Sequence, residues 1–183
     1  MDAERNLILS IVAWDGKSIA CDSMSISGEM KQETEKMRVL ADGTILVWTG
    51  PYENGLGLIL WWVAGALVDE WPSYQSKDGN WARLIVAKAD GVVEYEQLPY
   101  PQPVMTPYAA WGSGRDFAIG ALAMGATAKE AVEVACKHCL SCGPPIRVAK
   151  RPCYHQWGFV GSYASKKICS ICGEEAEFTR GDI

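Results

Sequence analysis

The order of the predicted strands and helices constrains the fold of this chain more than any other feature. A nearly continuous apolar run at Leu7–Trp14 predicts a strand that is buried on both faces. Asp15-Gly16 favours a tight turn, and Lys17–Ser27 continues as the second strand of a hairpin. Two more hairpins are predicted, and their strands are Met37–Leu40 with Thr44–Thr49 and Ala82–Ala87 with Val92–Gln97. The chain is therefore expected to be rich in antiparallel strand pairs.

The predicted helices are grouped and do not alternate with the strands. Three helices are expected, at about 51–70, 115–124 and 127–140, followed by a last strand at Ile146–Ala149. Pro51 suits a first helical turn, and Thr127 with Glu130 three residues later forms a capping-box pattern. This order predicts an α+β fold of two antiparallel sheets with helices on their outer faces, and not a doubly wound parallel sheet.

Charge and hydropathy argue against several classes of function. The net charge of −5 is uneven, with six Lys/Arg against four Asp/Glu from Pro144 onward and 11 against 18 before it. The acidic body argues against a nucleic-acid groove. The longest uncharged apolar stretch, Gly55–Val68, has 14 residues, whereas a bilayer crossing needs about 20. The first residues lack the pattern of a secretory signal, so we expect a cytoplasmic protein with no membrane association.

Four residues near the C-terminus have the spacing of a metal site. Cys153 and His155 are followed, after thirteen intervening residues, by Cys169 and Cys172, and a glycine comes directly after Cys172. Two close pairs of such ligands are typical of a closed tetrahedral Zn²⁺ site, which is structural because no position is left for water. A segment this short cannot bury enough apolar surface to hold itself. We therefore predict that residues 150–183 form a small zinc-binding module.

The other clustered cysteines have a different interpretation. Cys136, Cys139 and Cys142 are spaced by three, which resembles part of an iron–sulfur run. They fall in or just after a well-patterned helix, where this spacing places them along one side. The sequence therefore favours small buried side chains on a core face over a cluster.

Four short motifs within the first 114 residues resemble the motifs of a known protein family. The candidate residues lie in four short motifs: Ser10 and Asp22 in SIVAWDGKSIACDS, Lys36 in EKMR, Gly50 in TG, and Ser113 in WGSG. In this order the motifs resemble those of the Ntn-hydrolase superfamily, and specifically of proteasome β-subunits and HslV, including compact forms found in phage genomes. The resemblance covers about residues 8–148.

The resemblance implies a four-layer αββα sandwich over residues 10–149 and a peptidase that uses its N-terminal residue as nucleophile. Ser10 falls on the family's threonine nucleophile, so residues 1–9 would be a propeptide or N-terminal extension. Lys36 falls on the lysine that lowers the pKa of the nucleophile, and Asp22 on a conserved aspartate. Gly50 falls where an amide forms the oxyanion hole, and Ser113 on an accessory serine. The resemblance also implies a homo-oligomer that takes peptide substrates, with an unfoldase or assembly partner.

The chemistry of such a site can be derived from the residue types alone. A hydroxyl is a weak nucleophile unless a base lies beside it. A free N-terminus supplies that base, because an α-amino group has a pKa of about 7.7–8.0. The chain has only two histidines, and one of them, His155, belongs to the predicted metal set. These facts favour an N-terminal amine over a histidine as the base.

The geometry of the first hairpin is open at this stage. A three-residue loop would pair Ser10 with Ala20 and place Ser10 and Asp22 on one face of the sheet. A two-residue turn at Asp15-Gly16 would pair Ser10 with Cys21 and point Asp22 to the opposite face. The proposed chemistry requires the first arrangement or a bulge.

An alternative function follows from departures from the family pattern. The nucleophile position holds serine, and nine residues precede it. The family places a supporting aspartate near residues 137–143, where this chain has Cys139 or His138. The alternative is a catalytically inactive protein of the same fold that serves as an assembly, structural or adaptor component through its zinc-bound tail.

Overall fold

The computed structural model describes residues 10–27, 30–73, 81–159 and 166–177, so the predicted N-terminal extension at 1–9 lies outside the described residues. The chain divides into two compact units, of which the first ends at Arg151 and the second begins at Pro152. Within the described ranges, every helix is too short or too polar to cross a bilayer.

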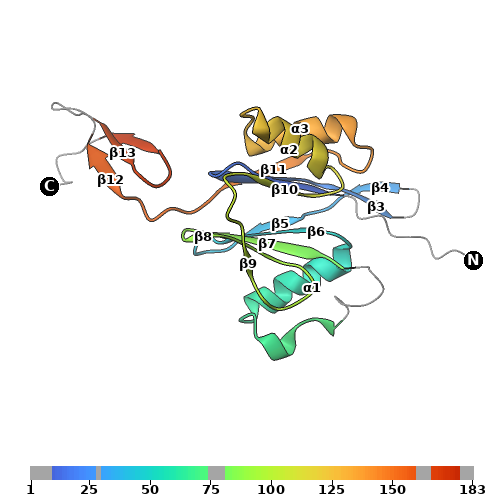
Figure 1. Cartoon of the computed structure of the whole chain (residues 1–183). Coiled ribbons are helices and arrows are strands. Elements are labelled where there is room, and N and C mark those ends of the chain that lie inside the picture. The colour runs from blue at the N-terminus through green and yellow to red at the C-terminus, as the bar shows by residue number, and fades with distance from the viewer. Residues whose placement is uncertain (1–9, 28–29, 74–80, 160–165, 178–183) are drawn as a thin grey trace, which may run out of the picture. The chain divides into compact units, whose positions relative to one another are not determined.

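Two antiparallel sheets form the centre of the first unit (Figure 1). The first has the order β10-β1-β2-β11, with β1 at Ile11–Trp14, β2 at Ser18–Asp22, β10 at Ala109–Gly112 and β11 at Ile146–Lys150. The second has the order β5-β6-β7-β8-β9, with β5 at Met37–Val39, β6 at Ile45–Thr49, β7 at Arg83–Lys88, β8 at Gly91–Tyr95 and β9 at Gln102–Pro103. A two-stranded ribbon, β3 (Met24–Ser27) with β4 (Met30–Glu33), follows β2.

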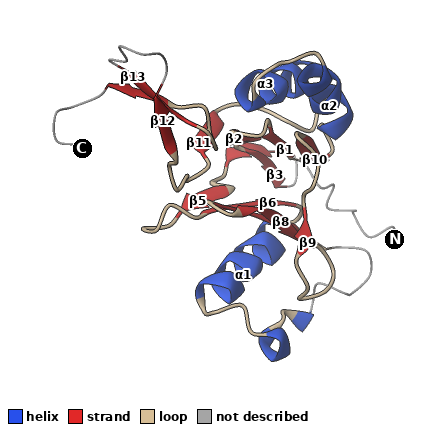
Figure 2. Ribbon diagram, turned by 60° about the vertical axis from the view of Figure 1, so that its left-hand side comes forward, coloured by secondary structure: helices blue, strands red, loops and turns tan. Residues whose placement is uncertain are grey.

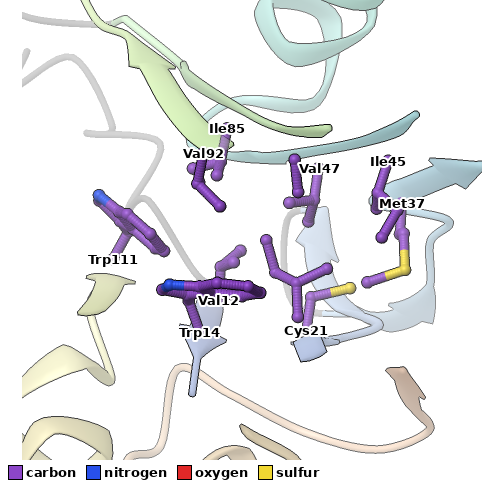
Figure 3. Close-up of a cluster of buried hydrophobic side chains, with 11 residues drawn as sticks. Val12, Trp14, Cys21, Met37, Ile45, Val47, Ile85, Val92 and Trp111 are labelled. Carbon is purple, nitrogen blue, oxygen red and sulfur yellow. The ribbon is translucent and has the colours of Figure 1, made fainter. Parts of the chain in front are cut away.

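The two sheets pack face to face over an apolar core (Figure 3). Successive side chains of a strand point to opposite faces of its sheet. From the first sheet, Val12, Trp14 and Cys21 point toward the second, where they meet Val47 and Ile85. All five side chains are buried. Ile11 and Ala13, on the opposite face of β1, are buried as well, which explains why the first predicted strand is apolar at consecutive positions.

Helices cover the outer face of each sheet (Figure 2). The three helices are α1 (Tyr52–Val63), α2 (Arg115–Ala123) and α3 (Ala128–His138). Ile11 and Ala13 of β1 form a second core with Leu122 of α2 and Val132 of α3. Helix α1 covers the second sheet over a third core. The predicted four-layer αββα sandwich is therefore confirmed.

Helix α1 is shorter than predicted. It ends at Val63 and not near Glu70, because Gly65 and Ala66 both take positive φ values, 114° and 54°. The amide of Ala66 donates back to the carbonyl of Trp61 at 3.0 Å, which closes the helix end. A separate short 3-10 turn follows at Val68–Glu70. The apolar run at 55–68 therefore buries one face of a helix and then turns.

Both predicted registers of the first hairpin are wrong. Ala13 pairs with Ala20, which leaves a four-residue loop from Asp15 to Ser18. The Asp15 carboxylate sets this loop, because its Oδ1 accepts from the amides of Lys17 and Ser18 at 2.9 and 2.7 Å. Side-chain bonds of this kind compete with the two-residue turn that the Asp-Gly sequence favours.

The predicted capping box at the start of α3 is confirmed. The Thr127 hydroxyl accepts from the Glu130 amide at 3.3 Å, and the Glu130 carboxylate accepts from the Thr127 amide at 2.8 Å. Asp15 Oδ2 accepts from the amide of Ala128 at 2.7 Å, so the first hairpin also caps this helix. Three amides at the helix start are thus satisfied.

We expect Thr127→Ala to lower the free energy of unfolding by about 0.5–2 kcal/mol, the usual cost of removing an N-cap hydroxyl. Urea denaturation of the two proteins measures this difference. Lys129→Ala on the same helix is the control, because the Lys129 side chain is exposed and its change should stay within about 0.5 kcal/mol. Equal effects of the two substitutions would contradict the role of the cap.

The second unit contains a small antiparallel sheet of the order β12-β13-β14. Its strands are β12 (Trp157–Phe159), β13 (Lys166–Cys169) and β14 (Glu175–Glu177). Cys169, the last residue of β13, is buried, although most side chains around it are exposed. So small a sheet needs a staple in addition to its apolar contacts.

Candidate functional site

Ser10 lies directly before β1, and Ser113 holds its backbone. The Ser113 hydroxyl accepts from the Ser10 amide at 3.3 Å and donates to the Ser10 carbonyl oxygen at 3.3 Å. Ser113 is placed there by the turn between β10 and α2, and β10 is the antiparallel neighbour of β1. Two residues that are 103 positions apart are therefore brought together by the first sheet.

A glycine makes this close approach possible. Gly112 has a φ of 97°, and a Cβ atom built on it would lie 2.2 Å from the Ser10 carbonyl oxygen. Any side chain at position 112 would therefore push the Ser113 turn away from Ser10. The Gly-Ser-Gly pattern is explained here by backbone geometry.

The Asp22 carboxylate accepts four hydrogen bonds. Its Oδ1 accepts from the Ile11 amide at 3.0 Å and from Lys36 Nζ at 2.9 Å. Its Oδ2 accepts from the amides of Met24 and Gly143, at 3.3 and 3.2 Å. Since the Ile11 amide belongs to the peptide that follows Ser10, Asp22 fixes the backbone next to the candidate nucleophile. The predicted single strand 17–27 is interrupted at this point, between β2 and β3.

Asp22 and Lys36 form a buried ion pair, with side-chain exposures of 0% and 6%. Burial raises the pKa of the Asp22 carboxyl, while the Lys36 ammonium and the backbone amides act in the opposite direction. We assign the ionised form, because all four partners are donors and a carboxyl proton would face another hydrogen. Lys36 Nζ also donates to the Met24 carbonyl at 2.5 Å.

The Ser10 hydroxyl itself has no hydrogen-bond partner among the described residues, although the residue is only 1% exposed. The buried Ser23 hydroxyl also has no hydrogen-bond partner among the described residues. Buried polar groups are nearly always paired, so an unpaired hydroxyl at this position calls for an explanation. A reactive oxygen that meets its partner only when substrate is bound is one explanation.

Gly50 follows the end of β6 in the second sheet. Its φ is 108°, and a Cβ atom built on it would lie 2.7 Å from the Ala82 Cα and 2.8 Å from the Trp81 carbonyl oxygen. The amide of Trp48, two residues earlier, donates to the Lys36 carbonyl at 3.1 Å. The end of β6 is thus tied to Lys36, while the role of the Gly50 amide stays a prediction.

Solved structures similar to this chain have the fold that the resemblance implies, whereas the sequence matches no protein-family profile and no curated protein. BPH from Thiobacillus denitrificans, in complex with epoxomicin, is 19% identical with a TM-score of 0.58 and covers 78% of this chain and 99% of that one. HslV from Trypanosoma brucei is 18% identical, with a TM-score of 0.57 and coverages of 77% and 97%. Anbu from Hyphomicrobium sp. strain MC1 is 14% identical, with a TM-score of 0.61 and coverages of 77% and 81%.

The chain has a proteasome-like Ntn-hydrolase fold. Identities below 20% establish the fold and leave the activity to be argued from the site. Within this fold, Ser10, Asp22, Lys36 and Ser113 are linked by the contacts described above. Their catalytic roles stay predictions.

Cysteines occupy the region where the Ntn-hydrolase resemblance led us to look for an aspartate. Cys139 follows α3 directly, and Cys136, Cys139 and Cys142 pack against the core between α3 and the first sheet. The prediction that these cysteines are buried is confirmed for Cys142, whereas Cys136 and Cys139 pack against the core and are only partly buried. Burial raises the pKa of the Cys136 thiol to about 12, and the nearby Asp22 charge adds to this effect. The Cys136 thiol is therefore neutral at physiological pH and cannot replace a carboxylate.

Two backbone groups of the site were not predicted from the sequence. The Gly143 amide binds Asp22, and the Met24 carbonyl binds Lys36. In the sequence, Gly143 follows the predicted helix at 127–140 and precedes two prolines. A Cβ atom built on it would lie 2.7 Å from the Met24 sulfur, so the site also needs a glycine there. A backbone donor carries no side-chain signal, which is why sequence motifs did not reveal it.

The second unit brings the four predicted metal ligands together. One ligand atom from each of Cys153, His155, Cys169 and Cys172 lies within 4.8 Å of the others, so the cluster could hold a metal ion. The Cys153 and Cys169 sulfurs are 3.7 Å apart, and Cys172 Sγ is 3.5 Å from His155 Nδ1. In a tetrahedron with Zn–S bonds of about 2.3 Å and Zn–N bonds of about 2.0–2.1 Å, neighbouring ligands are about 3.5–3.8 Å apart. These two separations are therefore of the size expected around a tetrahedral ion.

The turn after β13 prepares this cluster. The Gly173 amide donates to the Cys169 carbonyl at 2.9 Å, and Gly173 takes a φ of 72°. The Ile171 amide points at the Cys169 sulfur, 3.4 Å away. Desolvation alone would raise the pKa of the Cys169 thiol, but backbone amides of Cys172 and Ile171 lower it to about 6. The His155 ring stacks on Trp157 with centroids 4.7 Å apart, which fixes the ring orientation.

Proposed function

We propose that residues 10–149 form an N-terminal-nucleophile peptidase of the proteasome/HslV type, in which Ser10 attacks after residues 1–9 have been removed. The observation that supports this best is the convergence on Ser10. Its hydroxyl is buried and has no hydrogen-bond partner among the described residues, Ser113 binds its amide and carbonyl, and the Asp22–Lys36 pair is anchored to the next amide.

Each group has a defined chemical task in this proposal. Ser10 Oγ attacks the amide carbonyl carbon, and the α-amine of the same residue takes the hydroxyl proton and passes it to the leaving amine. The positive charge of Lys36 favours the ionised oxygen, and Asp22 keeps Lys36 in place. Ser113 positions the amine, and the Gly50 amide stabilises the oxyanion.

The direct test is mass spectrometry combined with a peptidase assay. We expect the active species to begin at Ser10, and Ser10→Ala to abolish peptide hydrolysis. Ser23→Ala is the matched control, since it removes the other buried hydroxyl without a partner and should leave hydrolysis intact. A protein that hydrolyses peptides while it still begins at Met1, or that keeps its activity as Ser10→Ala, would contradict the proposal.

Epoxomicin provides a second test, because BPH was solved in complex with it. Native mass spectrometry should detect epoxomicin bound to the chain that begins at Ser10 and not to Ser10→Ala. Binding that is equal in the two proteins would place the ligand outside the proposed site.

A catalytically inactive assembly or adaptor protein of the same fold is the second candidate. The observation that favours it is that cysteines occupy the region near Asp22 where the family resemblance calls for a carboxylate. It predicts a chain that still begins at Met1, and a function that survives Ser10→Ala but is lost in Cys169→Ser. The mass measurement above separates the two candidates.

We infer that the ion of the second unit is a structural Zn²⁺. Three thiolates and an imidazole nitrogen are a donor set that zinc prefers, the four ligand atoms lie within 4.8 Å of one another, and four protein ligands leave no open position. We also infer that the protein is a cytoplasmic homo-oligomer that engages an unfoldase or assembly partner. Leu60, Val63, Leu67 and Val68 near the end of α1 are at least half exposed, which suits a subunit contact. Light scattering should then give at least twice the mass of one chain, which is 20.0 kDa when residues 1–9 are present. The mass of a single chain would contradict the homo-oligomer.

A further inference from the structure

The cysteines beside the Asp22 site have no task in the proposed function. Helix α3 ends at His138, and Cys139-Leu140-Ser141-Cys142 forms a turn in which the Cys142 amide donates to the Cys139 carbonyl at 3.2 Å. The first and fourth Cα atoms of such a turn lie less than about 7 Å apart, within the range that a disulfide can bridge. Both cysteines are free thiols.

The turn is open to small reagents from one side. Leu140, in its middle, is 92% exposed, and Cys139 is partly exposed, whereas Cys142 is buried. An attacking reagent would therefore reach Cys139 first, and Cys142 lies next to it as the second thiol.

The buried end of the turn contacts the backbone near Asp22 and the backbone near Ser10. Gly143, the next residue, donates its amide to Asp22 and accepts from the Ser23 amide at 3.3 Å. The Cys142 sulfur packs against Gly114, where a built Cβ atom would lie 2.8 Å from it. The Gly114 amide lies 3.5 Å from the Ser10 carbonyl oxygen. A displacement of the Cys142 sulfur would therefore reach the backbone around Asp22 and Ser10.

We propose that Cys139 and Cys142 form a reversible thiol–disulfide modification site, oxidised by a low-molecular-weight disulfide, and that its oxidation loosens the Gly143–Asp22 contact. The reasons are the turn that brings the two residues together, the partial exposure of Cys139 and the burial of Cys142 beside the Asp22 site. Closing the bond sets the distance between the sulfurs to about 2.05 Å, so the two sulfurs must leave their present positions, and that of Cys142 lies against Gly114.

The exchange balances with glutathione disulfide as the oxidant. The Cys139 sulfur, after losing its proton, attacks one sulfur of the reagent and releases one glutathione thiolate, which takes up that proton. The Cys142 sulfur then loses its proton and attacks the Cys139 sulfur, which releases the second glutathione as a thiol. Two protein S–H bonds are lost, one S–S bond forms, and the reagent is reduced to two thiols.

The experiment uses the full chain with its metal bound, incubated with glutathione disulfide, alkylated and digested with trypsin. Cleavage after Lys137 and Arg147 places Cys139 and Cys142 in one peptide, 138–147, and leaves Cys136 in another. We expect peptide 138–147 to be unalkylated and lighter by two hydrogen atoms, and dithiothreitol to reverse this. Cys136→Ser should behave in the same way, whereas Cys142→Ser should carry glutathione on Cys139.

Three results would overturn the site: alkylation of both cysteines, a glutathione adduct on Cys139 of the unmutated chain without ring closure, or a disulfide that joins Cys139 to Cys136.

Hydrogen exchange tests the structural consequence of oxidation, which is the loosened contact between Gly143 and Asp22. Oxidation should remove protection at the Gly143 amide, with no such loss in Cys142→Ser. Unchanged protection in the oxidised chain would refute the link to Asp22. Neither measurement depends on peptidase activity.

Discussion

Replacing Asp22 with asparagine should lower the free energy of unfolding by about 3–5 kcal/mol, the usual cost of breaking a buried ion pair by removing one partner. The carboxylate accepts two hydrogen bonds on each oxygen. Asparagine can place a carbonyl oxygen against only one of these pairs of donors. Its NH₂ group would then face two hydrogens, and the Lys36 charge would remain buried without its counter-ion.

Urea denaturation followed by tryptophan fluorescence measures this loss. Glu133→Gln is the control, because Glu133 pairs with Lys129 on the exposed face of α3 and exposed pairs contribute only about 0–1 kcal/mol. A change of less than about 1 kcal/mol in Asp22→Asn would mean that the pair is solvated and that its four bonds are not formed together.

Replacing Cys169 with serine should remove the metal from the second unit and unfold its small sheet. Apparent zinc affinities in zinc-finger peptides correspond to about 10–16 kcal/mol, far more than a sheet of three short strands can replace. We expect the zinc content to fall from about one ion per chain to near zero. Hydrogen exchange of residues 166–177 should lose its protection at the same time. A chelator added to the unmutated protein should produce the same two changes.

Cys136→Ser is the matched control for this experiment. It removes a thiol that belongs to the core of the first unit, so the zinc content should stay at the value of the unmutated chain. Since the two units are separately compact, the melting temperature of the first should not change in Cys169→Ser. Metal that remains bound after Cys169→Ser would show that the predicted ligand set is wrong.

The sandwich was predictable because its local signals agree with one another. Alternating and continuous apolar strands, the Thr127 capping box and the grouping of the helices all favour two sheets between helices. The register of the first hairpin was not predictable. Asp15 bonds to the start of α3, a contact between residues 113 positions apart, and that contact overrides the local preference of Asp-Gly for a tight turn.

The candidate site, too, was predictable in some of its groups and not in others. Side chains with a chemical signature, such as Lys36, Ser113 and the four metal ligands, were named from their motifs, and the structure brings each set together. The Gly143 amide can donate to Asp22 only because a turn far along the chain approaches β2. Such groups become visible only when the chain is folded.

The hydroxyl of Ser113 both accepts from and donates to the backbone of Ser10. An amine produced by a cut before Ser10 could donate to the same oxygen as the amide does now, and the carbonyl bond would be unaffected. Removal of the preceding residues would then change the charge of the Ser10 nitrogen and leave the contacts around it unchanged. On this view precursor and product differ in reactivity and scarcely in shape.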